Sequence, residues 1–201
     1  MGSDHTKKTI RLLLSGVGLC LTLALAACGS SSSDSGDPGS ANPSSNLTAA
    51  KATEPIKGAP PELASIRQQA NTVIDQSGAF EKKLASLEAA GIPVVVNKWA
   101  SWCGPCRAEF PDFQSAAIKY GDKVAFIGLN SNDGVDTART FLTELPVPYP
   151  SYEDQSGSLD NSIGANVGQP NTIFIDGTGK TVYRQLGPYA EPGDLDSDIE
   201  K

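Results

Sequence analysis

The chain has 201 residues, which is enough for one folded domain with short appended segments. Its formal net charge of −7 argues against a nucleic-acid-binding protein, because such proteins carry a basic face. We interpret the acidic balance as a feature that keeps the surface soluble.

The first 27 residues predict a secretory signal. Lys7, Lys8 and Arg11 form a positive region, and the apolar segment 12–27 that follows is short for a membrane-spanning helix, which needs about 20 residues. The end of this segment, Leu25-Ala26-Ala27-Cys28, resembles a bacterial lipobox. We therefore predict a lipoprotein signal peptide over 1–27 and lipidation at Cys28. A plain signal peptide and an uncleaved anchor helix are the alternatives.

Residues 28–58 are rich in Ser, Gly, Asp, Pro and Asn and show no apolar periodicity, so they are expected to form a disordered tether. The folded domain is predicted over 59–201. Cleavage after residue 27 would remove Cys20 and the only histidine, His5. A mature chain without histidine excludes a Cys–His dyad, a histidine metal ligand and a Ser–His–Asp triad.

Hydrophobic periodicity predicts alternating helices and strands through the rest of the chain. In chain order they are a helix at 62–70, a short strand at 72–75, a helix at 80–90, a strand at 93–100, a helix at 105–120, a strand at 124–129, a helix at 135–145, a short edge strand at 149–153, a short helix at 159–163, and a hairpin of 171–176 with 181–187. The last segment, 194–201, is brief, and we expect it to be short or poorly packed. This alternation indicates an α/β fold, with a central mixed sheet flanked by helices.

Two cysteines lie where the strand at 93–100 passes into the helix at 105–120, in the sequence Trp102-Cys103-Gly104-Pro105-Cys106. Two cysteines separated by two residues at a helix N-terminus are suited to reversible disulfide chemistry, because the free N–H groups and the helix dipole favour a thiolate on the first of them. Cys103 is therefore expected to be the attacking thiol and Cys106 the resolving thiol. Half of a zinc site is the alternative, but no second cysteine pair or histidine follows to complete four ligands.

The longer string VVVNKWASWCGPCRAEFP, which begins at Val94, resembles the TlpA/ResA-type extracytoplasmic branch of the thioredoxin superfamily. The resemblance covers roughly 71–187 and implies a thioredoxin-like fold. Members of this branch often carry a β-hairpin before the central strand, whereas this chain has a strand–helix opening typical of plain thioredoxin.

The resemblance also implies roles for individual residues. Glu109 stands where ResA-type proteins carry a glutamate implicated in proton transfer; an ordinary exposed helical glutamate is the alternative. The buried aspartate of thioredoxin is replaced by Asn97, which cannot titrate. Pro170 matches the cis-proline that faces the dithiol, the backbone of Gln169 could pair with a client strand, and Trp102 would offer an exposed platform for substrate.

Together these features predict a membrane-anchored, extracytoplasmic thiol:disulfide oxidoreductase that acts as a monomer, without a metal or organic cofactor. The resemblance favours reduction of disulfides in exported proteins such as apocytochrome c, with electrons from a CcdA/DsbD-like membrane donor. The alternatives are a disulfide-forming oxidase and, from another class, a binding lipoprotein with a vestigial redox motif. A thiol peroxidase is disfavoured because the Thr-x-x-Cys motif of peroxiredoxins is absent.

Overall fold

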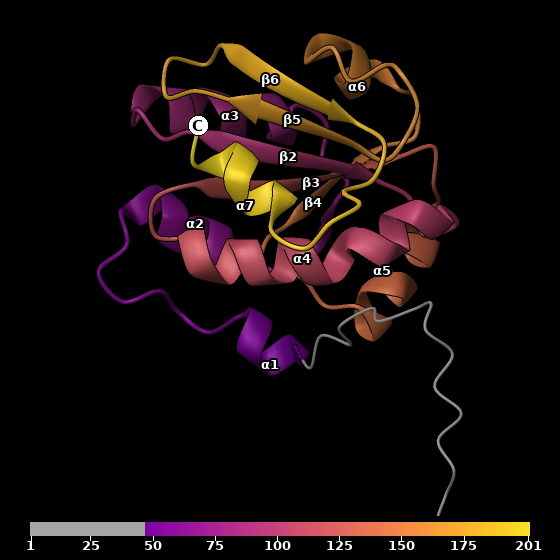
Figure 1. Ribbon diagram of the computed structural model, residues 1–201, viewed down its shortest axis with the longest axis horizontal. Coiled ribbons are helices and arrows are strands. Elements are labelled where there is room, and N and C mark those ends of the chain that lie inside the picture. Colours follow the sequence, from indigo (N-terminus) through magenta and orange to yellow (C-terminus); the bar gives the residue numbers. More distant parts are fainter. Residues whose placement is uncertain (1–46) are drawn as a thin grey trace, which may run out of the picture. The chain divides into compact units, whose positions relative to one another are not determined.

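A six-stranded mixed sheet forms the centre of the domain in the computed structural model, which describes residues 47–201 (Figure 1). The predicted signal peptide, Cys28 and most of the predicted tether lie outside the described residues. The strand order is β1-β4-β3-β2-β5-β6. The strands are β1 (Val73–Ile74), β2 (Val94–Trp99), β3 (Ala125–Ser131), β4 (Ser151–Asp154), β5 (Asn171–Ile175) and β6 (Thr181–Leu186).

The two strands at the centre, β2 and β3, are buried at every residue, as expected for parallel strands covered on both faces. They pair in parallel, with Val96 opposite Ile127. On its other side β2 pairs antiparallel with β5, where Val96 lies opposite Ile173. β5 then pairs antiparallel with β6, which forms one edge of the sheet.

Helices cover both faces of this sheet (Figure 1). The crossovers from β2 through α4 to β3 and from β3 through α5 to β4 run in the same direction, and because such crossovers are right-handed, α4 and α5 share a face. α3 returns in the opposite direction and covers the other face. The helices are α1 (Ala49–Ala52), α2 (Pro61–Gln68), α3 (Ala79–Ala89), α4 (Gly104–Tyr120), α5 (Val135–Glu144), α6 (Ser158–Ser162) and α7 (Asp194–Ile199).

An aromatic cluster fixes α4 and α5 to the sheet. The buried ring of Trp99 lies 5.3 Å from the ring of Phe110 and 5.0 Å from that of Phe141, measured between centroids. Trp99 Nε1 also donates a hydrogen bond to Ser151 Oγ at 3.1 Å. A side chain at Gly128 would collide with both partners of this bond, so glycine is required there. The last residue of β2 is thereby held rigidly, four positions before Cys103.

The prediction of an edge strand at 149–153 was wrong about its position in the sheet. β4 is internal, because it pairs in parallel with β3 on one side and with the two-residue strand β1 on the other. The burial of Ser151 and Tyr152 follows from this position. β1 is the edge strand instead.

Two terminal segments are more ordered than we predicted. The last part of the predicted tether contains α1, which Thr48 caps and whose Ala52 is buried, with Ala52 O accepting a hydrogen bond from Arg67 Nη1 at 3.3 Å. At the other end, α7 packs against α4 through the buried side chain of Leu195, and Lys119 Nζ lies 2.7 Å from Asp196 Oδ2. We predicted that residues 194–201 are short or poorly packed: the helix is short, with six residues, but it is well packed.

Candidate active site

The two cysteines at the start of α4 are joined by a disulfide, with their Cα atoms 5.3 Å apart. Cys103 is the N-cap of the helix, and its sulfur accepts a hydrogen bond from the backbone N–H of Cys106 at 3.2 Å. Pro105 occupies the first turn, where its missing N–H leaves no gap in the helical bonding. Cys103 is 4% exposed and Cys106 is fully buried. The helix N-terminus and this hydrogen bond both favour a thiolate on Cys103 once the disulfide opens.

The loop after β3 holds the segment that precedes the disulfide. The buried carboxylate of Asp133 accepts hydrogen bonds from the backbone N–H of Ser101 at 2.7 Å and from its hydroxyl at 3.0 Å. It also accepts from Asn130 Nδ2 at 3.0 Å and from the N–H of Gly134 at 2.9 Å. Sequence analysis missed Asp133. The run of polar residues directly after a buried strand was the signal available for it.

Two of the predicted client-binding residues, Trp102 and Gln169, lie at the same groove. Trp102 is 63% exposed, and its Nε1 donates to the backbone oxygen of Asn132 at 3.0 Å. The Gln169–Pro170 peptide bond is cis, Pro170 is buried and Gln169 is half-buried. Trp102 and Gln169 line one open groove of about 600 Å³, whose other lining residues include Lys98.

The sequence left two interpretations of Glu109, a group that takes part in proton transfer and an ordinary exposed helical glutamate. The second interpretation is wrong. Glu109 is only 1% exposed. Burial raises the pKa of its carboxyl to about 8, the nearby charge of Asp112 adds to this effect, and a 3.4 Å hydrogen bond from the backbone N–H of Tyr189 to Oε2 partly offsets it. The other oxygen, Oε1, has no hydrogen-bond partner among the described residues. At neutral pH the group is therefore mostly protonated.

Asn97 lies buried on β2, and its Nδ2 donates to the hydroxyl of Tyr149 at 3.3 Å. Burial raises the pKa of Tyr149 well above its usual range, and the charge of Glu109 contributes. Neither Asn97 nor Tyr149 titrates near neutral pH. Glu109, with a pKa of about 8, can exchange a proton there.

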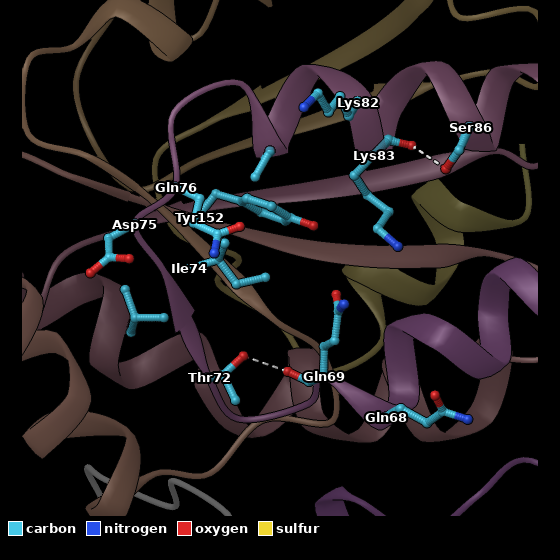
Figure 2. Close-up of a pocket in the computed structure, with 12 residues that line it drawn as sticks. Gln68, Gln69, Thr72, Ile74, Asp75, Gln76, Lys82, Lys83, Ser86 and Tyr152 are labelled. Carbon is cyan, nitrogen blue, oxygen red and sulfur yellow. Dashed lines mark hydrogen bonds between the residues drawn. The ribbon is translucent and has the colours of Figure 1, made fainter.

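A second open pocket, of about 660 Å³, lies at the β1 edge of the sheet and contains none of the predicted site residues. Figure 2 shows Lys83 and Tyr152 extending into it from α3 and β4. Lys83 Nζ donates to Ser65 Oγ at 3.2 Å. We assign this pocket no part in disulfide chemistry.

The described residues 47–201 contain no group of three or more His, Cys, Asp or Glu side chains placed to hold a metal ion. No helix in this range has both the length and the apolar character needed to cross a bilayer.

Comparison with known proteins gives consistent matches. The model of the family described as Redoxin matches residues 65–200. The thiol:disulfide interchange protein HelX of Rhodobacter capsulatus is 36% identical over 97 residues, which are 48% of this chain and 53% of HelX. The thiol:disulfide interchange protein DsbE of Escherichia coli is 35% identical over 115 residues, 57% of this chain and 59% of DsbE. The chain thus spans little more than half the length of these relatives.

Solved structures show the same fold. MTB dsbF, in its mixed oxidized and reduced forms, is 27% identical with a TM-score of 0.50, over 55% of this chain and 80% of that one. The exposed lipoprotein thioredoxin Etrx1 of Streptococcus pneumoniae is 25% identical with a TM-score of 0.51, over 58% and 88%. These matches confirm the predicted thioredoxin-like α/β fold and the resemblance to the thioredoxin superfamily.

Proposed function

The chain belongs to the Redoxin family, and on that premise we propose that it is a thiol:disulfide oxidoreductase whose redox centre is the Cys103–Cys106 pair. The observation that carries the proposal is the disulfide at the N-terminus of α4, with the sulfur of Cys103 bonded to a backbone N–H and Cys106 buried behind it. The names of HelX and DsbE support the same chemistry.

The proposed reaction transfers two electrons to a client disulfide. The thiolate of Cys103 attacks one client sulfur, which breaks the client S–S bond, forms a mixed disulfide and releases the other client sulfur as a thiolate. Cys106 then loses its proton, and its thiolate attacks the sulfur of Cys103. The client leaves as a dithiol with both sulfurs reduced, and the Cys103–Cys106 disulfide remains. A second dithiol must reduce this disulfide before the next turnover.

We propose that Glu109 exchanges a proton with the thiol of Cys106. Glu109 lies three residues after Cys106 on α4, and a pKa of about 8 lets its carboxyl gain or lose a proton near neutral pH. Replacing it with glutamine should change the pH profile of the exchange rate between pH 6 and 9. An unchanged profile would remove Glu109 from the mechanism.

The client is proposed to bind along the groove beside Cys103. Trp102 offers an exposed ring, and the backbone of Gln169 before the buried Pro170 can pair with an extended client segment. Apocytochrome c, with its closely spaced cysteines, is the client type that the TlpA/ResA resemblance favours. We propose that the protein acts as a monomer and needs no metal or organic cofactor.

The protein is proposed to work at the outer face of the cell membrane, held by a lipid on Cys28 and receiving electrons from a CcdA/DsbD-like membrane protein. The lipobox-like sequence at 25–28 supports this location, and the similar protein Etrx1 is described as an exposed lipoprotein. Replacing Cys28 with serine should shift the protein from the membrane fraction to the soluble fraction. An unchanged distribution would contradict the lipid anchor.

An insulin-reduction assay on the soluble domain tests the activity. With dithiothreitol as the electron source, the wild type should accelerate reduction, and Cys103→Ser should abolish the acceleration. Cys106→Ser should instead accumulate a mixed disulfide with the client, visible on a non-reducing gel. A wild type that gives no acceleration dependent on Cys103 would contradict the proposal and favour a binding lipoprotein.

The reduction potential of the Cys103–Cys106 pair decides the direction of the reaction. A value near about −270 mV in glutathione or dithiothreitol buffers would support a reductase. A value near about −120 mV would make the protein a disulfide-forming oxidase instead.

A further inference from the structure

A buried ion pair lies under the client groove and has no part in the chemistry described above. Lys98 is on β2, the strand that leads to the disulfide, and its Nζ lies 2.7 Å from Oδ2 of Asp160 on α6. The two side chains are only 4% and 5% exposed. Among the described residues that line the groove, they are the only charged ones.

The pair ties together several segments. Lys98 Nζ also donates to the backbone oxygen of Ala165 at 2.9 Å. Asp160 Oδ1 accepts a hydrogen bond of 2.7 Å from the hydroxyl of Ser131, the last residue of β3. The backbone N–H of Asp160 donates to Asp154 Oδ2 at 2.8 Å. The ammonium and the carboxylate of the pair thus connect β2, β3 and α6 to the chain at Ala165, and the backbone of Asp160 adds the link to β4.

Ala165 begins the loop that contributes Gln169 to the groove. Residues 165–170, which we call the proline loop, run from the end of α6 to the cis peptide bond before β5. The loop is held at its start, where the buried Ala165 accepts from Lys98 and its own N–H donates to the backbone oxygen of Asp160 at 2.7 Å. Asn166 and Val167 are exposed, and Gln169 is half-buried in the groove.

Stability alone does not account for such a pair. Removing two charges from water costs several kcal/mol, and apolar side chains of similar volume often stabilise a core as well or better. Buried pairs that persist can instead serve to fix one arrangement of the surrounding chain, since both charges must keep their partners. Here the arrangement that is fixed is the start of the proline loop.

We propose that Lys98 and Asp160 are positioning residues for the client: they hold the proline loop so that Gln169 and Pro170 present a preformed binding edge beside Cys103. The inference rests on the proposed function. It places the effect of the pair in client binding, because a preformed loop loses less conformational entropy when a client segment binds.

The test compares a large and a small disulfide substrate. The double variant Lys98→Met/Asp160→Asn removes both charges and nearly keeps the volume. We expect its KM for insulin to rise about tenfold with kcat within about twofold of the wild type. Its rate with oxidised glutathione, which is too small to span the groove, and its reduction potential should not change.

Val96→Ala is the matched control, because Val96 is buried on the same face of β2 and does not contact the proline loop through a hydrogen bond. It should lower stability and leave the KM for insulin unchanged.

An unchanged KM for insulin in the double variant would overturn the inference and leave the pair with a purely structural role. Equal losses with insulin and glutathione would also overturn it, because the effect would then lie at the dithiol. The proposed function fails separately, if the wild type shows no turnover that depends on Cys103.

If the double variant does not fold, the single variant Asp160→Asn provides the test through amide hydrogen exchange. The N–H of Ala165 should exchange at least about tenfold faster than in the wild type. An unchanged exchange rate would contradict the proposal.

Discussion

Glu109 carries a proton at neutral pH because the fold buries it without a cation. The described residues place no lysine or arginine within ion-pair distance of it, and its bonded oxygen has only the weak N–H donor of Tyr189. The folded protein therefore keeps a proton that the unfolded chain releases near its ordinary pKa of 4.5. Between that value and about 8 the folded state binds more protons than the unfolded state. The free energy of unfolding must therefore fall as the pH rises from 4.5 to about 8.

We predict that the oxidised wild type loses about 3–5 kcal/mol of unfolding free energy between pH 5 and pH 9 through this one group. Glu109→Gln should not show this loss. Urea denaturation at several pH values measures it, and the disulfide form is used so that neither cysteine titrates. Glu81→Gln, at an exposed position on α3, is the control and should follow the wild type. A Glu109→Gln curve parallel to the wild type would show that the carboxyl is already ionised at neutral pH.

Single residues show where the sequence was informative and where it was not. The chemistry of Cys103 and Cys106 follows from their spacing and from the helix that begins between them, so a sequence suffices to propose it. The burial of Glu109 depends on a loop 80 residues later in the chain. Lys98 offered a local hint, because a lysine within a run of buried strand residues needs a buried partner. Asp160, the partner, could not be identified without the tertiary structure.

Among the elements, the loop between β3 and α5 contributes most to the shape of the active site. Asp133 in this loop collects four hydrogen bonds from Ser101, Asn130 and Gly134. It joins the start of α5 to the segment between β2 and α4. The position of the disulfide is therefore set by two neighbouring strands and not by β2 alone.

Replacing Asp133 with alanine should lower the free energy of unfolding by about 2–4 kcal/mol, because it leaves several buried donors without a partner. Asp136→Ala, at a fully exposed carboxylate in the first turn of α5, should change stability by less than about 0.5 kcal/mol. Denaturant titration of both variants makes the comparison. Equal effects would indicate that Asp133 is solvated and contributes no more than a surface residue.

The order of helices and strands could be read from the sequence because hydrophobic periodicity is local. The position of a strand within the sheet is not local. The segment at 149–153 looked like an edge strand because it is short and partly polar. Its polar Ser151 is buried in order to accept a hydrogen bond from Trp99, a contact between residues 52 positions apart. The two-residue strand that covers its other side was too short to indicate a sheet edge.

At the scale of the whole domain, the C-terminal segment completes the active-site layer. Tyr189 lies against Phe113 with ring centroids 6.3 Å apart, its N–H reaches Glu109, and Leu195 is buried against the α4 face. The C-terminal segment thus helps to shield the Glu109 carboxyl from water. Such a long-range effect is not visible in the segment's own composition.

Deleting residues 188–201 should therefore have two effects. Stability should fall by at least about 3 kcal/mol through lost apolar burial, and the pH dependence attributed to Glu109 should flatten as water reaches its carboxyl. Leu195→Ala separates the two, because it should cost about 2–4 kcal/mol while Tyr189 still covers Glu109. Urea titrations at pH 5 and pH 9 measure both effects. A truncated protein that keeps the full pH dependence would show that α4 and the sheet alone bury the carboxyl.

The two tryptophans of the chain give its redox state an optical signal. The indole of Trp102 is exposed and adjoins Cys103 in the chain, whereas Trp99 is enclosed by Phe110 and Phe141. A disulfide quenches the fluorescence of a neighbouring indole by accepting an excited electron, and two thiols quench it less. Reduction should therefore brighten the long-wavelength emission of Trp102 more than the shorter-wavelength emission of Trp99. The unlabelled protein can thus report its own oxidation state during turnover, with one indole as the sensor and the other as the internal reference.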